Sequence, residues 1–173
     1  MKQITVRRGV IKINKTYTSR IYVDKHFYCF GGIEKESIAK QLRIELKSNF
    51  KSLTLEGFQI WFLSKTLELK RNKTIKEFNL FKNEQSDSGL RRNNNTSAYL
   101  KDNFYIVRLM KNGQSYCFPS LHSEILANDL KAKAVNIANT KPLKEFQEWF
   151  LNTTLSLVKE STIDKLNLFK EKI

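Results

Sequence analysis

The chain has 173 residues, of which 40% are apolar and 12% aromatic, and its formal charge is +14. This apolar content suffices for a packed core, and the charge favours polyanionic partners and excludes a mimic of DNA. No apolar run approaches the roughly 18 residues of a membrane-spanning helix, and the N-terminal residues lack the apolar stretch of a signal peptide. We therefore expect a cytoplasmic protein without a membrane partner.

The first 30 residues contain three short segments that are typical of strands. They are VRRGVIKI at 6–13, TYTSRIYV at 16–23 and FYCF at 27–30. The last two are rich in β-branched and aromatic residues, and the turn residues DKH separate them. The sequence therefore predicts a three-stranded antiparallel sheet at the start of the chain.

Helical patterns follow the strands. Gly31-Gly32 end the strand run, after which Ile38, Leu42 and Leu46 recur four residues apart. A second apolar period of three and four residues runs through 58–69. Thr-Ile-Lys-Glu at 74–77 has the capping-box pattern that begins a helix, so a short third helix is predicted there.

Much of this pattern occurs twice in the chain. FQIWFLSKTLELKRNKTIKEFNLFK at 58–82 is echoed by FQEWFLNTTLSLVKESTIDKLNLFK at 146–170, 88 residues later. Upstream, the same shift matches further residues without a gap, among them Tyr17, Arg20, Tyr28, Cys29 and Phe30. We interpret the chain as a duplication, with a first repeat at 1–82, a linker at 83–97 and a second repeat at 98–173. The predicted fold is α+β, with two tandem repeats, each a small three-stranded antiparallel sheet followed by about three helices.

The second repeat carries its own strand and hairpin signals. YIVRLM at 105–110 and SYCF at 115–118 flank a turn that contains Asn112-Gly113. This dipeptide tolerates the positive φ angles of a tight hairpin, so it predicts a hairpin here. The preceding segment, NEQSDSGLRRNNNTS, is rich in Asn and Ser, which is typical of a linker.

Basic residues are predicted to gather on the open face of each sheet. If Ile21 and Val23 point toward the helices, alternation places Arg20 on the opposite face, and Arg108 is its counterpart in the second repeat. The predicted nucleic-acid-binding residues are Arg7, Arg8, Lys12, Lys15, Arg20, Tyr22, Lys25, Phe27, Arg91, Arg92, Lys101, Arg108, Lys111 and Gln114. Residues 1–82 hold 18 Lys or Arg and 7 Asp or Glu (+11), whereas residues 83–173 hold 13 and 10 (+3). The first repeat is therefore the expected main binder, and the second binds more weakly or contacts protein.

Part of the first repeat resembles a known family. RGV at 8–10, RIYV at 20–23 and FGG at 30–32, with Ala39 and Arg43 on the following helix, resemble the APETALA/ethylene-response-factor-type DNA-binding domain. The arm-binding domains of phage integrases are similar. The resemblance implies a three-stranded sheet in the major groove of duplex DNA, contacted by Arg8, Lys12, Arg20, Tyr22 and Phe27. The second repeat departs from this pattern, since FGG is replaced there by Phe118-Pro119-Ser120.

Catalytic and metal-binding patterns are weak. The two histidines, His26 and His122, are not equivalent in the two repeats, and neither has a carboxylate or cysteine at metal-ligand spacing. Cys29 and Cys117 match each other but have no neighbouring histidine, which favours a small apolar role over a nucleophile. We predict no enzyme activity, no metal and no cofactor.

Three functions remain open from the sequence. The first is a duplex-DNA-binding regulator of transcription or architectural factor of the phage or mobile-element type. The second is a protein-targeting inhibitor or modulator of a host enzyme that handles nucleic acids. The third is an RNA-binding protein, in which Tyr22 and Phe27 stack on bases.

Overall fold

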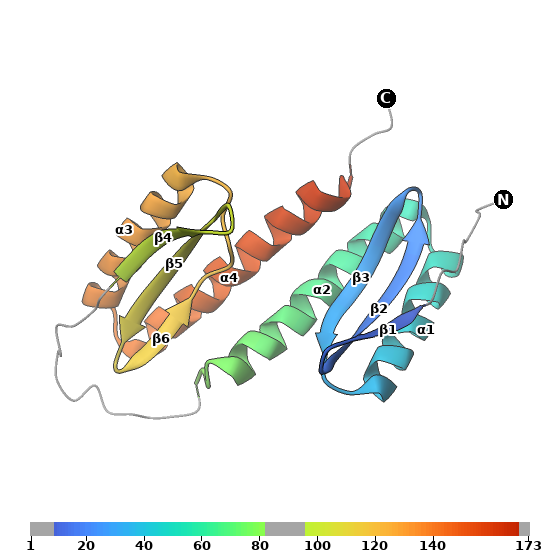
Figure 1. Cartoon of the computed structure of the whole chain (residues 1–173), viewed down its shortest axis with the longest axis horizontal. Helices are drawn as coiled ribbons and strands as arrows, with labels where there is room; N and C mark the ends of the chain where they lie inside the picture. Colours follow the sequence, from blue (N-terminus) through green and yellow to red (C-terminus); the bar gives the residue numbers. More distant parts are fainter. Residues whose placement is uncertain (1–8, 82–95, 170–173) are drawn as a thin grey trace. The chain divides into compact units, whose positions relative to one another are not determined.

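The computed structural model describes residues 9–81 and 96–169, which form an α+β protein (Figure 1). In the first of these ranges the elements are β1 (Val10–Ile13), β2 (Thr16–Val23), β3 (His26–Ile33), α1 (Glu36–Ser52) and α2 (Leu55–Glu77). In the second they are β4 (Thr96–Lys101), β5 (Phe104–Lys111), β6 (Gln114–Cys117), α3 (Glu124–Thr140) and α4 (Leu143–Leu166). The same order of three strands and two helices therefore occurs twice.

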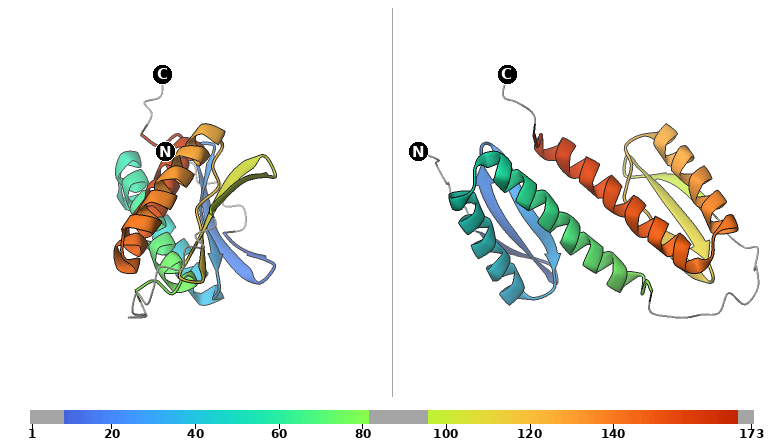
Figure 2. Two further views of the ribbon diagram at one scale, coloured as in Figure 1. Left: turned by 90° about the vertical axis from the view of Figure 1, so that its left-hand side faces the viewer. Right: turned by 180° about the vertical axis from the view of Figure 1, so that it is seen from behind.

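Each sheet is antiparallel and three-stranded, with the order β1-β2-β3 or β4-β5-β6. Figure 2 shows that α1 and α2 cover one face of the first sheet, and that α3 and α4 cover one face of the second. Alternation along β2 buries Ser19, Ile21 and Val23 against the helices. Within residues 9–81 and 96–169, no helix covers the other face of either sheet, as expected for an antiparallel sheet with one polar side.

Tight turns join the strands. Asn112 and Gly113 have φ angles of 48° and 75°, which confirms the predicted hairpin between β5 and β6. Asp24-Lys25 and Asp102-Asn103 also adopt positive φ angles, although neither pair contains glycine. Asn and Asp tolerate this conformation because their short polar side chains bond locally.

The predicted third helix of each half is wrong, because α2 and α4 are continuous. Thr74 was expected to begin a new helix but lies inside α2, where it is 1% exposed. Neither Gly nor Pro interrupts the sequence between Phe58 and Glu77, so nothing in the backbone ends the helix there. The Thr74 hydroxyl is buried and has no hydrogen-bond partner in the described part of the chain, so it does not cap a helix.

The chain forms two compact units that differ from the predicted repeat boundaries. Unit 1 contains the described residues up to Glu68 and those from Lys159 onward, and unit 2 contains Leu69–Val158. The last turns of α2 therefore pack with the second sheet, and those of α4 pack with the first. The predicted linker at 83–97 lies outside the described residues except for Thr96 and Ser97, which begin β4.

An Asn-Leu-Phe segment completes the core of unit 2. Leu80, just beyond α2, is 1% exposed and packs in one apolar cluster with Val107, Tyr116 and Phe150. The next backbone N–H, that of Phe81, donates to Gln147 Oε1 at 3.2 Å. The side-chain N–H of Gln147 in turn donates to the Tyr116 hydroxyl at 3.2 Å.

The equivalent segment of α4 makes the same bonds in unit 1. Leu168 is 1% exposed, and the Phe169 N–H donates to Gln59 Oε1 at 3.3 Å. Gln59 donates to the Tyr28 hydroxyl at 3.3 Å. The recurrence of Gln, Tyr and Asn-Leu-Phe in the sequence therefore has a structural cause: each long helix ends in the unit formed mainly by the other half of the chain.

Candidate nucleic-acid interface

The uncovered face of the first sheet is built from alternate residues of its three strands. Arg20 pairs with Cys29 and Tyr22 pairs with Phe27 across β2 and β3. Because paired residues point to the same side, these four side chains share the face opposite Ile21 and Val23. We call this surface the uncovered face of unit 1, defined by Ile11, Ile13, Thr18, Arg20, Tyr22, Phe27 and Cys29.

An arginine and two aromatic rings form a cluster on this face. The Arg20 guanidinium carbon lies 4.9 Å from the centroid of the Phe27 ring. The rings of Tyr22 and Phe27 have their centroids 4.7 Å apart, and Phe27 is 43% exposed. This distance is within the range of a cation–π contact, which favours a position of the guanidinium against the ring. The buried Nε of Arg20 has no hydrogen-bond partner within residues 9–81 and 96–169.

Two lysines lie at the ends of the central strand. Lys15 occupies the turn before β2 and Lys25 the turn after it, and both are exposed. At about 3.3 Å per residue, each is roughly 16 Å along the strand from Arg20. Positive charge is thus present at the middle and at both ends of β2.

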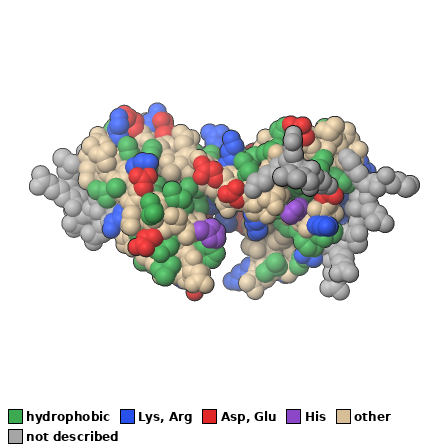
Figure 3. All heavy atoms as spheres, turned by 90° about the horizontal axis from the view of Figure 1, so that it is seen from above, with side chains coloured by type: hydrophobic (Ala, Val, Ile, Leu, Met, Phe, Trp, Pro, Cys, Tyr) green, Lys and Arg blue, Asp and Glu red, His purple; other side chains and the backbone are tan. Residues whose placement is uncertain are grey.

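The continuous basic strip predicted for this face is wrong for Lys12. Lys12 pairs with Tyr17, which shares the covered side of β2 with Ser19 and Ile21. The Lys12 ammonium lies 5.8 Å from the Tyr17 ring centroid, on the α1 side of the sheet. Arg7, Arg8, Arg91 and Arg92 lie outside the described residues. On the face that Figure 3 displays, Lys and Arg side chains are interspersed with acidic and hydrophobic ones.

The uncovered face of the second sheet carries a different set of residues. Arg108 is exposed and pairs with Cys117, like Arg20 with Cys29. Met110 and Ser115, however, occupy the places of Tyr22 and Phe27. Lys101 is exposed at the end of β4. In the described ranges the cluster of arginine and two aromatic rings is therefore a property of unit 1.

Lys111 does not lie on that face. It is 7% exposed, and its ammonium donates to the carbonyl oxygens of Ala138 at 2.6 Å and Lys141 at 2.8 Å. These carbonyls are at the C-terminal end of α3, where the helix dipole favours a cation. Lys111 has the same strand parity as Val107 and Leu109, which explains its inward direction. The prediction that it belongs to the open basic cluster is wrong.

Gln114 also has an internal role. Its side-chain N–H donates to the backbone carbonyl of Phe78, and its carbonyl oxygen accepts from the Tyr116 hydroxyl at 3.3 Å. Gln114 is half-buried and helps to hold the end of α2 in unit 2. It is thus engaged in the core, away from the predicted cluster on the open face.

Reactive side chains are sparse in the described ranges. Desolvation raises the pKa of the Cys29 thiol, against the opposing effect of Arg20, so the thiol form prevails at neutral pH. Within residues 9–81 and 96–169, no group of three or more His, Cys, Asp and Glu side chains could hold a metal ion. No helix in these ranges combines the length and apolar character needed to cross a membrane.

A set of cations on α1 was missing from the predicted site. Lys40, Arg43 and Lys47 are separated by three and four residues, so they share one side of the helix. Their spacing was the signal that could have found them. Comparisons with models of protein families, with curated proteins and with solved structures gave no match. Functional inference therefore depends on the geometry of the two units.

Proposed function

We propose that the protein is a non-enzymatic DNA-binding protein, built as two tandem repeats, whose unit 1 contacts duplex DNA through its uncovered face. The single observation that carries this proposal is the cluster of Arg20, Tyr22 and Phe27. Unit 2 keeps the arginine, as Arg108, but has lost both aromatic partners. The sheet of unit 2 forms without an aromatic pair at these positions, so the pair is not required for folding. This comparison favours a role in binding for Tyr22 and Phe27.

The chemistry of the cluster suits a base edge. A planar guanidinium held by a ring can donate two parallel hydrogen bonds to the O6 and N7 of guanine in the major groove. Lys15 and Lys25, at the ends of β2, supply contacts to phosphates, which position a protein without reading the sequence. The excess of 18 Lys or Arg over 7 Asp or Glu in residues 1–82 adds long-range attraction.

A second set of DNA contacts from unit 2 would strengthen binding through effective concentration. Arg108 and Lys101 are the exposed cations that would make them. A protein of this kind acts as a regulator or architectural factor in the cytoplasm of a phage-infected or element-bearing cell. RNA is the alternative polyanion. Competition between duplex DNA and RNA for the protein distinguishes the two.

The test compares matched arginines. Fluorescence anisotropy with labelled duplex DNA should show a loss of at least roughly tenfold in affinity for Arg20→Ala, and a loss below about threefold for Arg108→Ala. Arg20→Lys keeps the charge but not the planar fork, and it should behave like Arg20→Ala. Affinity should also fall steeply with salt, by about 0.9 of a decade per contacted phosphate and decade of salt. Equal effects of the two alanine variants, or tighter binding to RNA than to duplex DNA, would refute the proposal.

A second function is favoured by apolar residues on unit 2. Leu100, Ile125 and Leu126 are 60%, 80% and 58% exposed, and the first of these occupies the place of Lys12 in unit 1. Exposed large apolar side chains are typical of protein contacts. We propose protein binding by unit 2 as the alternative, in which the target is a host enzyme that handles nucleic acids. A pull-down that retains its partner after nuclease treatment and loses it in Leu126→Asp would support this function.

A further inference from the structure

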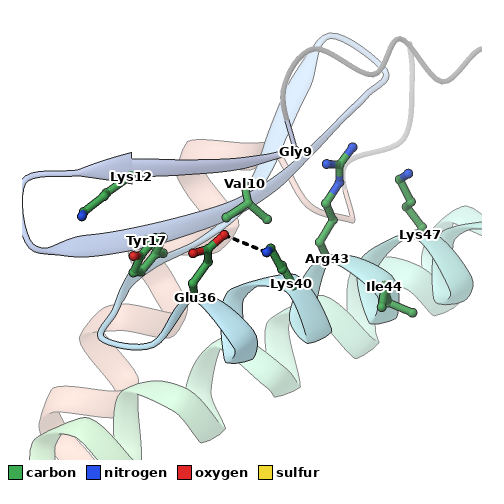
Figure 4. A pocket seen from close by; sticks show the side chains of 9 residues that line it. All are labelled: Gly9, Val10, Lys12, Tyr17, Glu36, Lys40, Arg43, Ile44 and Lys47. Carbon is green, nitrogen blue, oxygen red and sulfur yellow. Dashed lines mark ion pairs between the residues drawn. The ribbon is translucent and has the colours of Figure 1, made fainter.

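A groove lies between β1 and α1 on the covered side of the first sheet (Figure 4). Its volume is about 850 Å³, and it is lined by Gly9, Val10, Lys12, Tyr17, Glu36, Lys40, Arg43, Ile44 and Lys47. Four of these residues are cationic and one is acidic. The groove belongs to unit 1 alone and is separate from the uncovered face, which is on the other side of the sheet.

The cations are arranged along the groove. Lys40, Arg43 and Lys47 are three and four residues apart on α1, so they extend over about 10 Å of helix axis. Lys12 lies on β1 at the opposite wall, and its side chain points away from those of Arg43 and Lys47 (Figure 4). Among the described residues, none of Lys12, Arg43 and Lys47 lies within ion-pair distance of a carboxylate, although Lys12 acts on the Glu36 carboxyl at longer range.

The one acid among the lining residues does not cancel this charge. Glu36 lies 2.8 Å from the Lys40 ammonium, and both side chains are exposed. The hydrogen bond from Lys40 lowers the pKa of the Glu36 carboxyl, so this pair is fully ionised at neutral pH. The groove therefore keeps three cations, Lys12, Arg43 and Lys47, beyond the ion pair.

Arg43 occupies the space that a side chain at Gly9 would fill. A Cβ placed on Gly9 would lie 1.5 Å from the guanidinium carbon of Arg43. The Nε of Arg43 is buried and has no hydrogen-bond partner among the described residues. A guanidinium in this position has donors available for an incoming acceptor.

Unit 2 shows that the fold does not need these charges. The positions 88 residues after Lys12, Lys40, Arg43 and Lys47 hold Leu100, Asn128, Lys131 and Val135. A single cation remains, although the strands and helices are the same. Repulsion between Arg43 and Lys47, four residues apart on α1, is a cost that a purely structural role does not explain.

We infer that this groove binds consecutive phosphate groups of an oligophosphate anion. Arginine and lysine are the side chains that best match phosphate oxygens, and three cations along one helix suit a chain of phosphates. One strand of a nucleic acid presents such a series of phosphates. The same chemistry is offered by free polyphosphate. The inference goes beyond the proposed function, because it stands whether or not the uncovered face binds DNA.

The experiment measures binding of inorganic tripolyphosphate and of a single-stranded oligonucleotide by calorimetry at fixed ionic strength. In the full chain, Lys12→Ala with Lys47→Ala should weaken binding at least tenfold. Lys131→Ala with Lys144→Ala removes the same charge from unit 2 and should change it less than about twofold. Gly9→Ala keeps every charge but displaces Arg43, and it should weaken binding by a factor of roughly three to ten.

The two ligands identify the source of the phosphates. If the Lys12→Ala with Lys47→Ala variant loses binding of tripolyphosphate, the ligand of the groove is a free polyphosphate. If this variant loses binding of the oligonucleotide alone, the ligand is a nucleic-acid strand. Equal losses in the two double variants, or the absence of binding by both ligands, would overturn the inference. Arg20→Ala separates it from the proposed function, because that variant should weaken duplex binding and leave tripolyphosphate binding unchanged.

Discussion

Truncation of Leu80 to alanine tests the observation that the end of α2 completes the core of unit 2. The side chain is 1% exposed and belongs to the cluster around Val107 and Tyr116. Leu80→Ala removes three carbon atoms, which are worth about 0.8 kcal/mol each in transfer free energy, or about 2.4 kcal/mol together. The cavity that remains adds to this loss, so the expected decrease in the free energy of unfolding is about 3 to 4 kcal/mol.

Native-state hydrogen exchange locates the effect. A loss of about 3 kcal/mol should increase the exchange of β5 amides by roughly 100-fold. Leu100→Ala is the matched control in the same unit, since Leu100 is 60% exposed and its truncation should cost no more than about 0.5 kcal/mol. The reasoning is refuted if Leu80→Ala costs no more than Leu100→Ala. It is also refuted if protection is lost in β2 while β5 is unchanged.

Three further predictions follow from the structure. Lys111→Met leaves the terminal carbonyls of α3 without their donor, so chemical denaturation should show a decrease of about 1–3 kcal/mol in the free energy of unfolding. A change in DNA affinity without a loss of stability would contradict the internal role of Lys111. Burial raises the pKa of the Tyr28 and Tyr116 hydroxyls above 10.0. Unfolded tyrosines ionise near pH 10, so above this pH the unfolded state binds fewer protons than the folded state and stability must fall. If the urea midpoint of the double variant Tyr28→Phe with Tyr116→Phe falls as steeply with pH as that of the parent protein, these hydroxyls are not the cause. Asn79 has a φ angle of 47°, a conformation that Gly adopts more readily than Ala. Thermal unfolding should therefore show a loss of about 1 kcal/mol of stability for Asn79→Ala and almost none for Asn79→Gly. Equal stabilities of the two variants would show that the conformation is not strained.

Local patterns were sufficient for much of the fold. Alternation in β2 placed Ile21 and Val23 inside and Arg20 outside, because a strand has a period of two whatever its neighbours are. The spacing of Leu42 and Leu46 gave the buried side of α1 for the same kind of reason. Asn112-Gly113 predicted the hairpin because its backbone preference is local.

The candidate site depended on information that local patterns lack. The side on which Lys12 lies is fixed by its pairing with Tyr17, a matter of register between strands. Lys111 had a readable signal in its parity with Val107 and Leu109, but the preference of lysine for solvent suggested the opposite direction. The Arg20 cluster also required the pairing of Tyr22 with Phe27 across two strands.

The exchange of helix ends was the least predictable feature. Asn-Leu-Phe recurs at 79–81 and 167–169, which indicates a shared role but gives no partner. The partners, Gln147 and Gln59, lie 66 and 110 residues away in sequence. Contacts between residues so far apart produce no periodic pattern in the sequence. A single sequence therefore indicates that the segment has a role but does not identify the residues against which it packs.

The reciprocal bonds of Gln59 and Gln147 also decide how the gene can be divided. Fragments cut between the two predicted repeats would have complementary defects. The first fragment would expose Leu80, which packs in the core of unit 2, and its own core would lack Leu168. Each fragment alone should therefore aggregate or remain partly unfolded, and co-expression should restore both. Expression of the intact polypeptide, rather than of either half, is the sound starting point for crystallisation and for library screening.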